Sequence, residues 1–224
     1  MKLDHPLIRY HGGKFRLASW IISYFPSHET YVEPFGGGAS VLLSKSPSRM
    51  EVYNDLDQDI VNFFEVLRDQ TLAEKLAFQV ELTPYSRSEF LNARAETNDR
   101  IEQARRLVVR AQMGFGSAGA TKGNTGFRLD TARGGSDIVT IWQRQPEVIR
   151  QAAARLKKVL IENRDAIKVI QDHDREDTLF FIDPPYVLDT RNMGGKAYLT
   201  YSRDHFEFML SDIFDSLAND YDRF

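Results

Sequence analysis

The amino-acid sequence predicts an α/β fold: a parallel, nucleotide-binding type of sheet, interrupted between its second and third strands by an inserted, mainly helical region. Three observations predict it. Short apolar runs of strand length end in turns rich in glycine, proline or acidic residues. Segments with helical periodicity separate these runs, as parallel strands require. A stretch without strand signals, rich in glycine and basic residues, divides the strands into two groups.

The N-terminal segment combines a glycine motif with a predicted helix. Residues 10–14 read Tyr-His-Gly-Gly-Lys. Apolar residues then recur at the positions of one helical face, namely Leu17, Trp20, Ile21, Tyr24 and Phe25. Pro26 is expected to end this helix.

Two strands with informative ends follow. The first covers residues 30–33 and ends in Pro-Phe-Gly-Gly-Gly, after which a helix is expected over residues 39–45. The second covers residues 50–53 and ends in Asn-Asp. The next helix carries one apolar face made of Ile60, Phe63, Phe64 and Leu67. This order of elements is typical of the first half of a nucleotide-binding sheet.

Residues 70–150 change in character and predict helices joined by a long loop. Spacing identifies one helix through Ile101, Ala104, Val108 and Ala111. Seven of the 14 glycines then fall between Gly114 and Gly135, and loops of this length inside a compact domain are usually functional or disordered. We therefore expect one discontinuous domain, residues 1–69 and 151–224, with residues 70–150 inserted into it.

Charge is distributed unevenly, although the net charge is only −3. Residues 100–160 carry 12 Lys or Arg and 4 Asp or Glu, a balance of +8. The remaining residues carry 17 basic and 28 acidic side chains, a balance of −11. A basic segment in an acidic protein favours contact with a polyanion. The alternative is a solvated helical face.

Strands resume at residues 158–162 and 178–183. The last strand is almost wholly apolar, as a strand buried on both faces should be, through Leu179, Phe180, Phe181 and Ile182. It ends in Asp-Pro-Pro-Tyr at residues 183–186. A final helix is predicted from Asp204 as its N-cap and Glu207 three residues on, with an apolar face made of Phe206, Met209, Leu210, Ile213 and Leu217.

Composition excludes several classes of protein. With 42% apolar and 27% charged residues in 224 positions, the chain is globular rather than disordered. Cysteine is absent, which excludes disulfide scaffolds, thiolate metal sites and cysteine nucleophiles. The five histidines are not at ligand spacing, so no metal is expected. No apolar run reaches membrane-spanning length and no signal-peptide core occurs, so we expect a cytoplasmic protein without membrane contact.

The glycine turn and the acid after the second strand form a candidate nucleoside site. Residues 33–39 lack the Gly-Lys-Ser/Thr end of a P-loop and the full spacing of the dinucleotide motif. Their three glycines would let a ligand press against the backbone, or would simply form a tight turn. Asp55 lies 20 residues after Phe35, where a carboxylate can accept both ribose hydroxyls. Its alternative role is to cap the helix that begins at Leu56.

Residues 183–186 carry the most specific signal. At roughly 5% usage per residue type, a given four-residue string arises in such a chain about once in a thousand. A rigid turn explains the prolines, but not Asp183 before them and Tyr186 after them. The Asp183 carboxylate and the Pro184 carbonyl can accept both protons of an aromatic amine, which draws the nitrogen lone pair out of conjugation. Tyr186 offers a face on which an extruded base can stack.

Together these motifs resemble, in order and over the whole chain, the Dam-type DNA adenine-N6 methyltransferases, which use S-adenosylmethionine (AdoMet). The resemblance implies catalytic roles for Asp183, Pro184 and Tyr186. It implies an AdoMet site made of Tyr10, Lys14, Phe35, Gly36, Gly37, Gly38, Asp55, Asp165 and Asp183. In the family the motif at residues 10–14, often with Trp-Ala at its start, holds the methionyl end of AdoMet. Asp165 resembles the acid that meets the cofactor's adenine, and it could equally cap a short helix.

The family's segment between the second and third strands recognises DNA. The resemblance therefore implies that residues 70–150 bind double-stranded DNA with a flipped adenine, while residues 1–69 and 151–224 form the AdoMet-binding catalytic domain. The expected DNA contacts are Arg110, Lys122, Asn124, Arg128 and Arg133.

The resemblance changes after the last predicted helix. The family continues with a further central strand and an antiparallel pair, whereas this sequence ends at Phe224. We therefore expect an incomplete sheet, self-association through its uncovered edge and reduced activity. Two other functions stay open. One is a cytosine-N4 or RNA amino-methyltransferase, because such enzymes share the Pro-Pro-Tyr pattern, and the other is a non-catalytic remnant that binds DNA or AdoMet.

Overall fold

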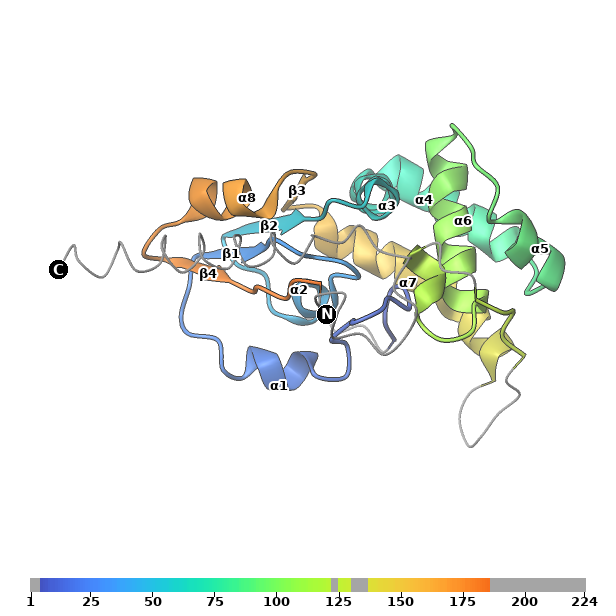
Figure 1. The fold of residues 1–224 in the computed structure, drawn as a ribbon, viewed down its shortest axis with the longest axis horizontal. Helices are drawn as coiled ribbons and strands as arrows, with labels where there is room; N and C mark the ends of the chain where they lie inside the picture. Colours follow the sequence, from blue (N-terminus) through green and yellow to red (C-terminus); the bar gives the residue numbers. More distant parts are fainter. Residues whose placement is uncertain (1–4, 122–124, 130–136, 186–224) are drawn as a thin grey trace.

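The computed structural model of the chain describes residues 5–121, 125–129 and 137–185. Its sheet consists of the parallel strands β1 (Thr30–Glu33), β2 (Met50–Asn54), β3 (Val159–Glu162) and β4 (Thr178–Phe180). Their order across the sheet is β3-β2-β1-β4, so β1 and β2 are central (Figure 1). Each strand lies where the sequence predicts one. Because the strands are parallel, their carboxyl ends share one edge of the sheet.

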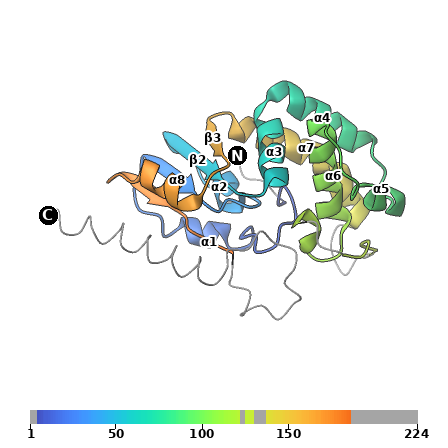
Figure 2. The same cartoon turned by 45° about the horizontal axis from the view of Figure 1, so that its top comes forward.

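Helices lie on both faces of this sheet. In the described part of the chain they are α1 (Ala18–Ile22), α2 (Ser40–Ser44), α3 (Gln58–Arg68), α4 (Gln70–Leu82), α5 (Arg87–Asn92), α6 (Arg100–Met113), the 3-10 helix η1 (Ala118–Thr121), α7 (Ile138–Leu156) and α8 (Ala166–His173). Val32 and Val52 face α8 and pack against its Val169. Tyr31 and Tyr53 point the other way, into the larger core. Accordingly, α1 and α8 lie on opposite sides of the sheet (Figures 1 and 2).

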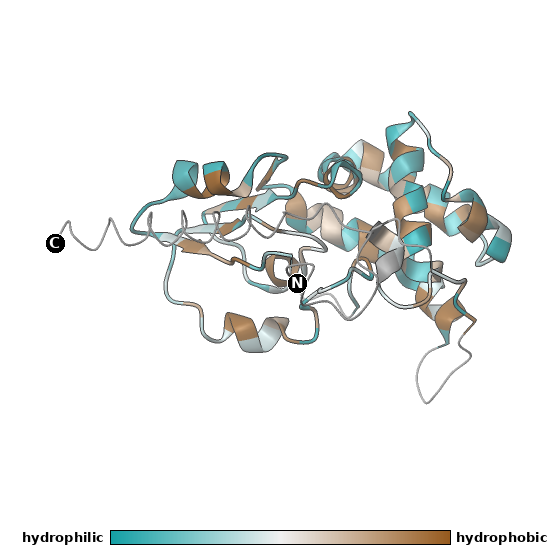
Figure 3. Cartoon of the chain, viewed as in Figure 1, coloured by the Kyte–Doolittle hydropathy of each residue, from teal (hydrophilic) through white to brown (hydrophobic). Residues whose placement is uncertain are grey.

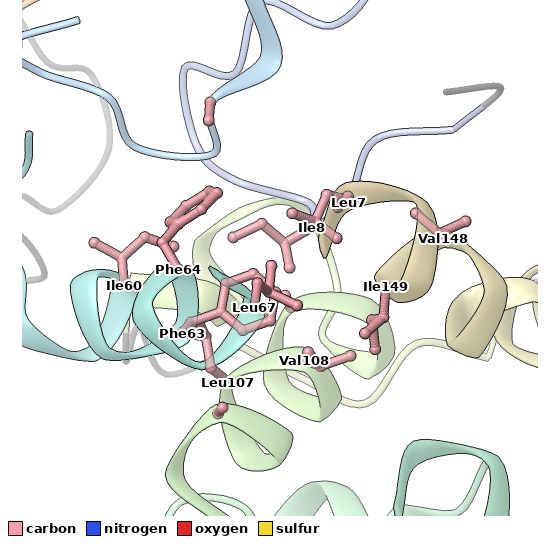
Figure 4. Close-up of a cluster of buried hydrophobic side chains, with 14 of the residues drawn as sticks. Leu7, Ile8, Ile60, Phe63, Phe64, Leu67, Leu107, Val108, Val148 and Ile149 are labelled. Carbon is pink, nitrogen blue, oxygen red and sulfur yellow. The ribbon is translucent and has the colours of Figure 1, made fainter. Parts of the chain in front are cut away.

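Helices α3 to α7 lie between β2 and β3 in the chain. Within this group, α4 packs against α7, and α3 packs against α6. Their apolar sides meet the N-terminal segment in the cluster of Figure 4, which includes Leu7, Ile8, Ile60, Phe63, Phe64, Leu67, Leu107, Val108, Val148 and Ile149. Hydrophilic residues lie on other sides of the same helices (Figure 3). The cluster continues to Tyr31 and Leu42 beside the sheet, so these helices and the sheet share one hydrophobic core.

Acidic and hydroxyl residues fix where most helices begin. In each of the helices α3 to α8, the side chain of the residue just before the first turn accepts a hydrogen bond from a backbone N–H of that turn. These capping residues are Asp57, Asp69, Ser86, Asp99, Asp137 and Asp165. Such a cap contributes about 1 kcal/mol to helix stability, because it satisfies donors that have no partner inside the helix. Within the residues that the structure describes, no helix is long and apolar enough to cross a membrane.

The first helix is shorter and less buried than predicted. It covers only Ala18–Ile22, and Leu17, Trp20 and Tyr24 are 51%, 62% and 70% exposed. After α1, the Tyr24 and Phe25 amides donate to carbonyls three positions back rather than four, so the chain there is wound more tightly than an α-helix. Ile21 and Phe25 of the predicted apolar face do pack against the core. Leu17, Trp20 and Tyr24 do not, because the predicted spacing assumes a helix of more than two turns.

The last described strand also differs from the prediction. β4 ends at Phe180 instead of Asp183, and Leu179 and Phe180 are half-buried rather than fully buried. Among the described residues β4 pairs only with β1. Tyr186, the predicted helix after Asp204 and the predicted gap in the sheet lie outside the described residues.

Candidate functional site

Asn54 joins the turns that follow three neighbouring strands. Its side-chain nitrogen donates to the Pro34 carbonyl at 2.8 Å and to the Arg164 carbonyl at 3.0 Å. Its side-chain oxygen accepts from the Arg164 amide at 2.9 Å. Pro34 follows β1, Asn54 ends β2 and Arg164 follows β3, so one buried amide group fixes the carboxyl edge of the sheet. Nothing in the sequence signals this role.

Asp55 connects the second turn to the glycine turn. Its Oδ2 accepts from the Gly37 amide and its Oδ1 from the Asp57 amide, both at 2.9 Å. Its own carbonyl accepts from the Asn163 side chain at 2.7 Å. Burial raises the pKa of Asp55, and the two amides offset part of this effect. The alternative role as a helix cap is wrong, because Asp57 caps α3 by accepting from the Asp59 amide.

Two tyrosine rings shape the glycine turn. A Cβ atom on Gly36 would overlap the ring of Tyr53, whose hydroxyl donates to the Gly37 carbonyl at 2.8 Å. Gly37 has a φ of +47°, and a Cβ there would lie 2.7 Å from the ring of Tyr10. Gly38 is also close, since its Cβ would lie 3.0 Å from the Cβ of Tyr10. The glycines are therefore required by ring packing as well as by the turn.

Lys14 and Asp183 form an ion pair, although 169 residues separate them in the chain. The Lys14 ammonium contacts Oδ2 of Asp183 and also donates to the Gly12 carbonyl at 2.9 Å. The Lys14 and Asp183 side chains are 21% and 28% exposed, so a ligand can reach the pair. Pro184, the next residue, is half-buried.

These contacts bring most of the predicted cofactor residues together. Asp55 bonds Gly37, and Tyr10 packs on Gly37. The Tyr10 carbonyl accepts from the Gly13 amide at 3.1 Å. Lys14, the next residue, pairs with Asp183. A continuous chain of contacts thus runs along the carboxyl edge from the end of β2 to the end of β4.

Glu33, the last residue of β1, is a buried acid at this edge that the sequence analysis did not single out. Its Oε1 accepts from the Tyr31 hydroxyl at 2.8 Å and from the Leu42 amide at 2.7 Å. Burial raises its pKa to about 7; the charge of Lys45 lowers the pKa and that of Asp183 raises it. The signal in the sequence is an acid ending an apolar strand directly before the glycine turn.

Asp165 lies at the start of α8 and acts as its cap. Its Oδ1 accepts from the Ile167 amide at 3.1 Å and from the Lys168 amide at 3.3 Å. The capping role is therefore confirmed, and a ligand role remains a separate prediction. Phe35 packs near Ile170 of the same helix, so Phe35 and Asp165 flank the face of the sheet that α8 covers.

Arg110 is not a surface residue. Its side chain is 7% exposed, pairs with Asp59 at 3.2 Å and donates to the Ala93 carbonyl at 2.8 Å. This burial argues against the predicted contact of Arg110 with DNA, because the side chain joins α6 to α3 and to the end of α5. Three further predicted DNA contacts lie outside the described residues, namely Lys122, Asn124 and Arg133.

Described parts of the glycine-rich loop pack against α6. The Phe115 amide donates to the Gly126 carbonyl at 2.7 Å, and the Arg128 amide donates to the Met113 carbonyl at 2.8 Å. η1 also contacts α6, where a Cβ on Gly119 would overlap the helix backbone. Arg128 is thereby held beside the end of α6, with its side chain half-buried.

Three arginines gather here and have no carboxylate partner among the described residues: Arg9, Arg87 and Arg128. The Arg87 guanidinium lies 4.9 Å from the centre of the Phe127 ring. The ring centre of Tyr85 lies 5.3 Å from that of Phe127, with the rings tilted by 45°, and the Tyr85 hydroxyl donates to the Arg128 carbonyl at 2.9 Å. Burial, and then the charge of Arg128, lowers the pKa of Arg9. We call these three residues the arginine cluster.

Of this cluster, only Arg128 is predicted from the sequence. Arg9 and Arg87 lie outside the basic stretch of residues 100–160, so a local charge count does not include them. One guanidinium nitrogen of Arg9 is buried and has no hydrogen-bond partner among the residues that the structure describes. An anion is the natural partner for such a group.

Comparisons with known proteins agree with this arrangement. The family model of the D12 class N6 adenine-specific DNA methyltransferases matches residues 10–223. The DNA adenine methylase of Haemophilus influenzae is 35% identical over 69 residues, 30% of this chain and 24% of that protein. The DNA adenine methylase of Escherichia coli K12 is 31% identical over 71 residues, 32% of this chain and 25% of that protein. The DNA N-6-adenine-methyltransferase of Escherichia phage P1 is 28% identical over 67 residues, which are 30% of this chain and 9% of that protein. The matched stretches thus span about a quarter or less of these relatives.

Proposed function

The chain belongs to the family of D12 class N6 adenine-specific DNA methyltransferases, and on this premise we propose that it transfers a methyl group from AdoMet to N6 of adenine in double-stranded DNA. The observation that carries the proposal is the meeting of Lys14 and Asp183 at the carboxyl edge of the sheet. A cation from the N-terminal motif and a carboxylate from the end of β4 thereby face one ligand site, close to the glycine turn.

The residues at this edge fit AdoMet in charge and shape. Lys14 offers a cation for the methionyl carboxylate, and Asp55 offers a carboxylate for the ribose hydroxyls. The glycine turn leaves backbone without side chains for a ligand to approach. The remaining residues proposed for this site are Tyr10, Phe35, Gly36, Gly37, Gly38, Asp165 and Asp183. When bound, AdoMet supplies a methyl group on a sulfonium, which an amine nitrogen can attack.

Asp183 and Pro184 activate the target amine in this proposal. The Asp183 carboxylate accepts one N–H of the adenine amine, and the Pro184 carbonyl accepts the other. Proline fixes the backbone torsion φ, so these acceptors are oriented before the base arrives. Tyr186 provides the stacking face for the flipped base. Once nitrogen has formed its new bond, the Asp183 carboxylate can take the surplus proton.

Residues 70–150 are proposed to recognise DNA, with residues 1–69 and 151–224 forming the catalytic domain. Arg128 stays in the proposed contact set, together with Lys122, Asn124 and Arg133. The arginine cluster adds Arg9 and Arg87, because cations without a carboxylate partner in the described part of the chain are suited to phosphates. Since the matched stretches cover only part of each relative, the substrate is inferred from family and site chemistry.

One experiment tests the proposed reaction directly. The chain is incubated with AdoMet and mixed-sequence duplex DNA, and the methylated nucleosides are quantified by mass spectrometry. We expect N6-methyladenine from the parent chain and none from Asp183→Ala. N4-methylcytosine, or methylation of RNA alone, would show a different amine substrate. Binding of AdoMet and DNA without any methylated base would show a non-catalytic protein.

A further inference from the structure

Lys14 and Asp183 contact each other in the structure, yet the proposed function gives them different ligands. Lys14 is assigned to the methionyl carboxylate, and Asp183 to the amine of the target base. The ammonium lies on Oδ2, one of the two acceptor atoms of Asp183. A carboxylate whose charge is offset by an adjacent cation also attracts an amine N–H more weakly. The paired arrangement is therefore poorly suited to activating the base.

We propose that Lys14 couples the two substrates by holding Asp183 in an ion pair until Lys14 moves to the carboxylate of a bound cofactor. Only then is the Asp183 carboxylate released for the target amine. This coupling rests on the proposed function, and it makes capture of the base depend on prior binding of the cofactor. Lys14 is thus a positioning residue for the methyl-transfer step as well as a cofactor-binding residue.

The surroundings of the pair permit this exchange. Both side chains are partly exposed, at 21% and 28%, and ion pairs in contact with water are weak. Lys14 also donates to the Gly12 carbonyl, which keeps the ammonium within the N-terminal motif when Asp183 is released. The flexible four-carbon stem of lysine lets the ammonium turn from Asp183 toward another carboxylate that binds beside it.

A second lysine–carboxylate pair in the same protein lacks these properties. Lys45 and Glu51 are 3% and 2% exposed and lie 2.8 Å apart. Lys45 also donates to the Ser46 carbonyl and to the Ser48 hydroxyl, both at 2.7 Å. Because all its donors are used inside the protein, Lys45 is fixed. The contrast identifies Lys14–Asp183 as the exchangeable pair.

The test is a double-mutant cycle on cofactor binding, measured by calorimetry with S-adenosylhomocysteine. This probe has a neutral sulfur, so it removes any direct attraction between a sulfonium and Asp183. Asp183→Asn should bind the probe about two- to five-fold more tightly than the parent, because Lys14 no longer has to leave an ion pair. Lys14→Gln should bind more weakly. In the Lys14→Gln background, Asp183→Asn should give no gain.

Controls separate this coupling from other effects. Lys75→Gln removes an exposed lysine of α4 and should leave the affinity unchanged. Thermal melting checks that each variant is folded, and Asp183→Ala provides a second way to remove the carboxylate. Unchanged or weaker binding by folded Asp183→Asn and Asp183→Ala overturns the coupling while the proposed function stands. If the folded parent chain does not bind the probe, both the coupling and the proposed function are wrong.

Discussion

At the scale of single residues, Asp183 is the side chain on which the proposed chemistry depends most. It is 28% exposed, and its ion pair with Lys14 is in contact with water, so losing the carboxylate should cost about 1 kcal/mol of stability or less. We expect Asp183→Ala to shift the melting temperature by about 2–4 °C at most and to abolish methyl transfer. Calorimetric melting and mass spectrometry measure the two effects. Methylation at the parent rate would remove Asp183 from the mechanism.

Glu33 gives the protein a pH-dependent stability. Burial raises its pKa to about 7 in the folded chain, against about 4.3 in an unfolded one. The folded state therefore binds this proton more tightly, and the resulting stabilisation is complete below about pH 4 and is lost as the pH rises through 7. Glu33→Gln removes this dependence and keeps an oxygen for Tyr31 and Leu42.

Urea unfolding of Glu33→Gln and the parent, from about pH 5 to about pH 8.5, tests this expectation. The variant should gain stability relative to the parent as the pH rises, by a few kcal/mol in total, at about 1.36 kcal/mol per pKa unit. The gain should level off above about pH 8, where Glu33 is ionised in both states. A difference that stays constant with pH would contradict the raised pKa.

Sequence motifs predicted residues that the structure brings together at the carboxyl edge of the sheet, including Lys14, Asp55 and Asp183. They could not predict residues whose role depends on distant partners. Glu33, for example, accepts a hydrogen bond from the Leu42 amide, and only the folded chain brings these two residues together. Arg110 was misjudged because a local charge count does not reveal which side chains are buried, and α6 is buried on all sides from Leu107 to Met113.

At the scale of elements, the ion pair between Arg110 of α6 and Asp59 of α3 is a structural connection that mutation can test. Gln103 also donates to Asp59 at 2.7 Å. Arg110→Met should lower the free energy of unfolding by about 3–5 kcal/mol, because removing one partner leaves a buried charge without its counterion. The double variant Asp59→Asn/Arg110→Met should recover much of the loss. Urea denaturation measures both.

Arg144→Met is the matched control for that series, since Arg144 is an exposed arginine on α7. It should change the stability by less than about 0.5 kcal/mol. If Arg110→Met unfolds at the same urea concentration as the control, Arg110 contributes no more than a surface residue. A loss of DNA affinity in folded Arg110→Met at unchanged stability would instead support the DNA contact that the burial of Arg110 argues against.

Elements that turn residues bound on both sides were predicted better than elements whose length depends on packing against the rest of the fold. β1 and β2 are short segments with tyrosine and valine at their centres, bounded by turn residues, and both lie where predicted. The helix α1 was overextended because five apolar residues at helical spacing do not show how much of the sheet is available to cover them. The length of β4 was overestimated as well: the strand ends at Phe180, although the Phe181 amide still donates to the Val32 carbonyl of β1 at 2.9 Å.

At the scale of the whole molecule, the N-terminal segment connects the two proposed binding sites. Leu7 packs in the core of the helices, and its carbonyl accepts from Gln145 of α7 at 2.6 Å. Arg9 lies beside Arg128, Tyr10 packs on the glycine turn, and Lys14 reaches Asp183. Within eight residues the chain therefore passes from the proposed DNA side to the proposed cofactor side, so a shift of this segment would affect both.

The salt dependence of DNA binding tests the proposed DNA side. A cation that neutralises a phosphate releases counterions, so the logarithm of the affinity falls with that of the salt concentration by about 0.9 per phosphate contact. If the arginine cluster contacts phosphates, replacing Arg9, Arg87 and Arg128 with Gln should reduce the steepness by roughly 2–3. Fluorescence anisotropy with a mixed-sequence duplex, from about 50 to about 300 mM salt, measures this slope.

Arg49→Gln is the control, because Arg49 precedes β2 at the opposite edge of the sheet and pairs with Glu29. An equal slope for the triple variant and this control would show that the cluster does not face DNA, and the proposed recognition surface would then have to lie elsewhere in residues 70–150.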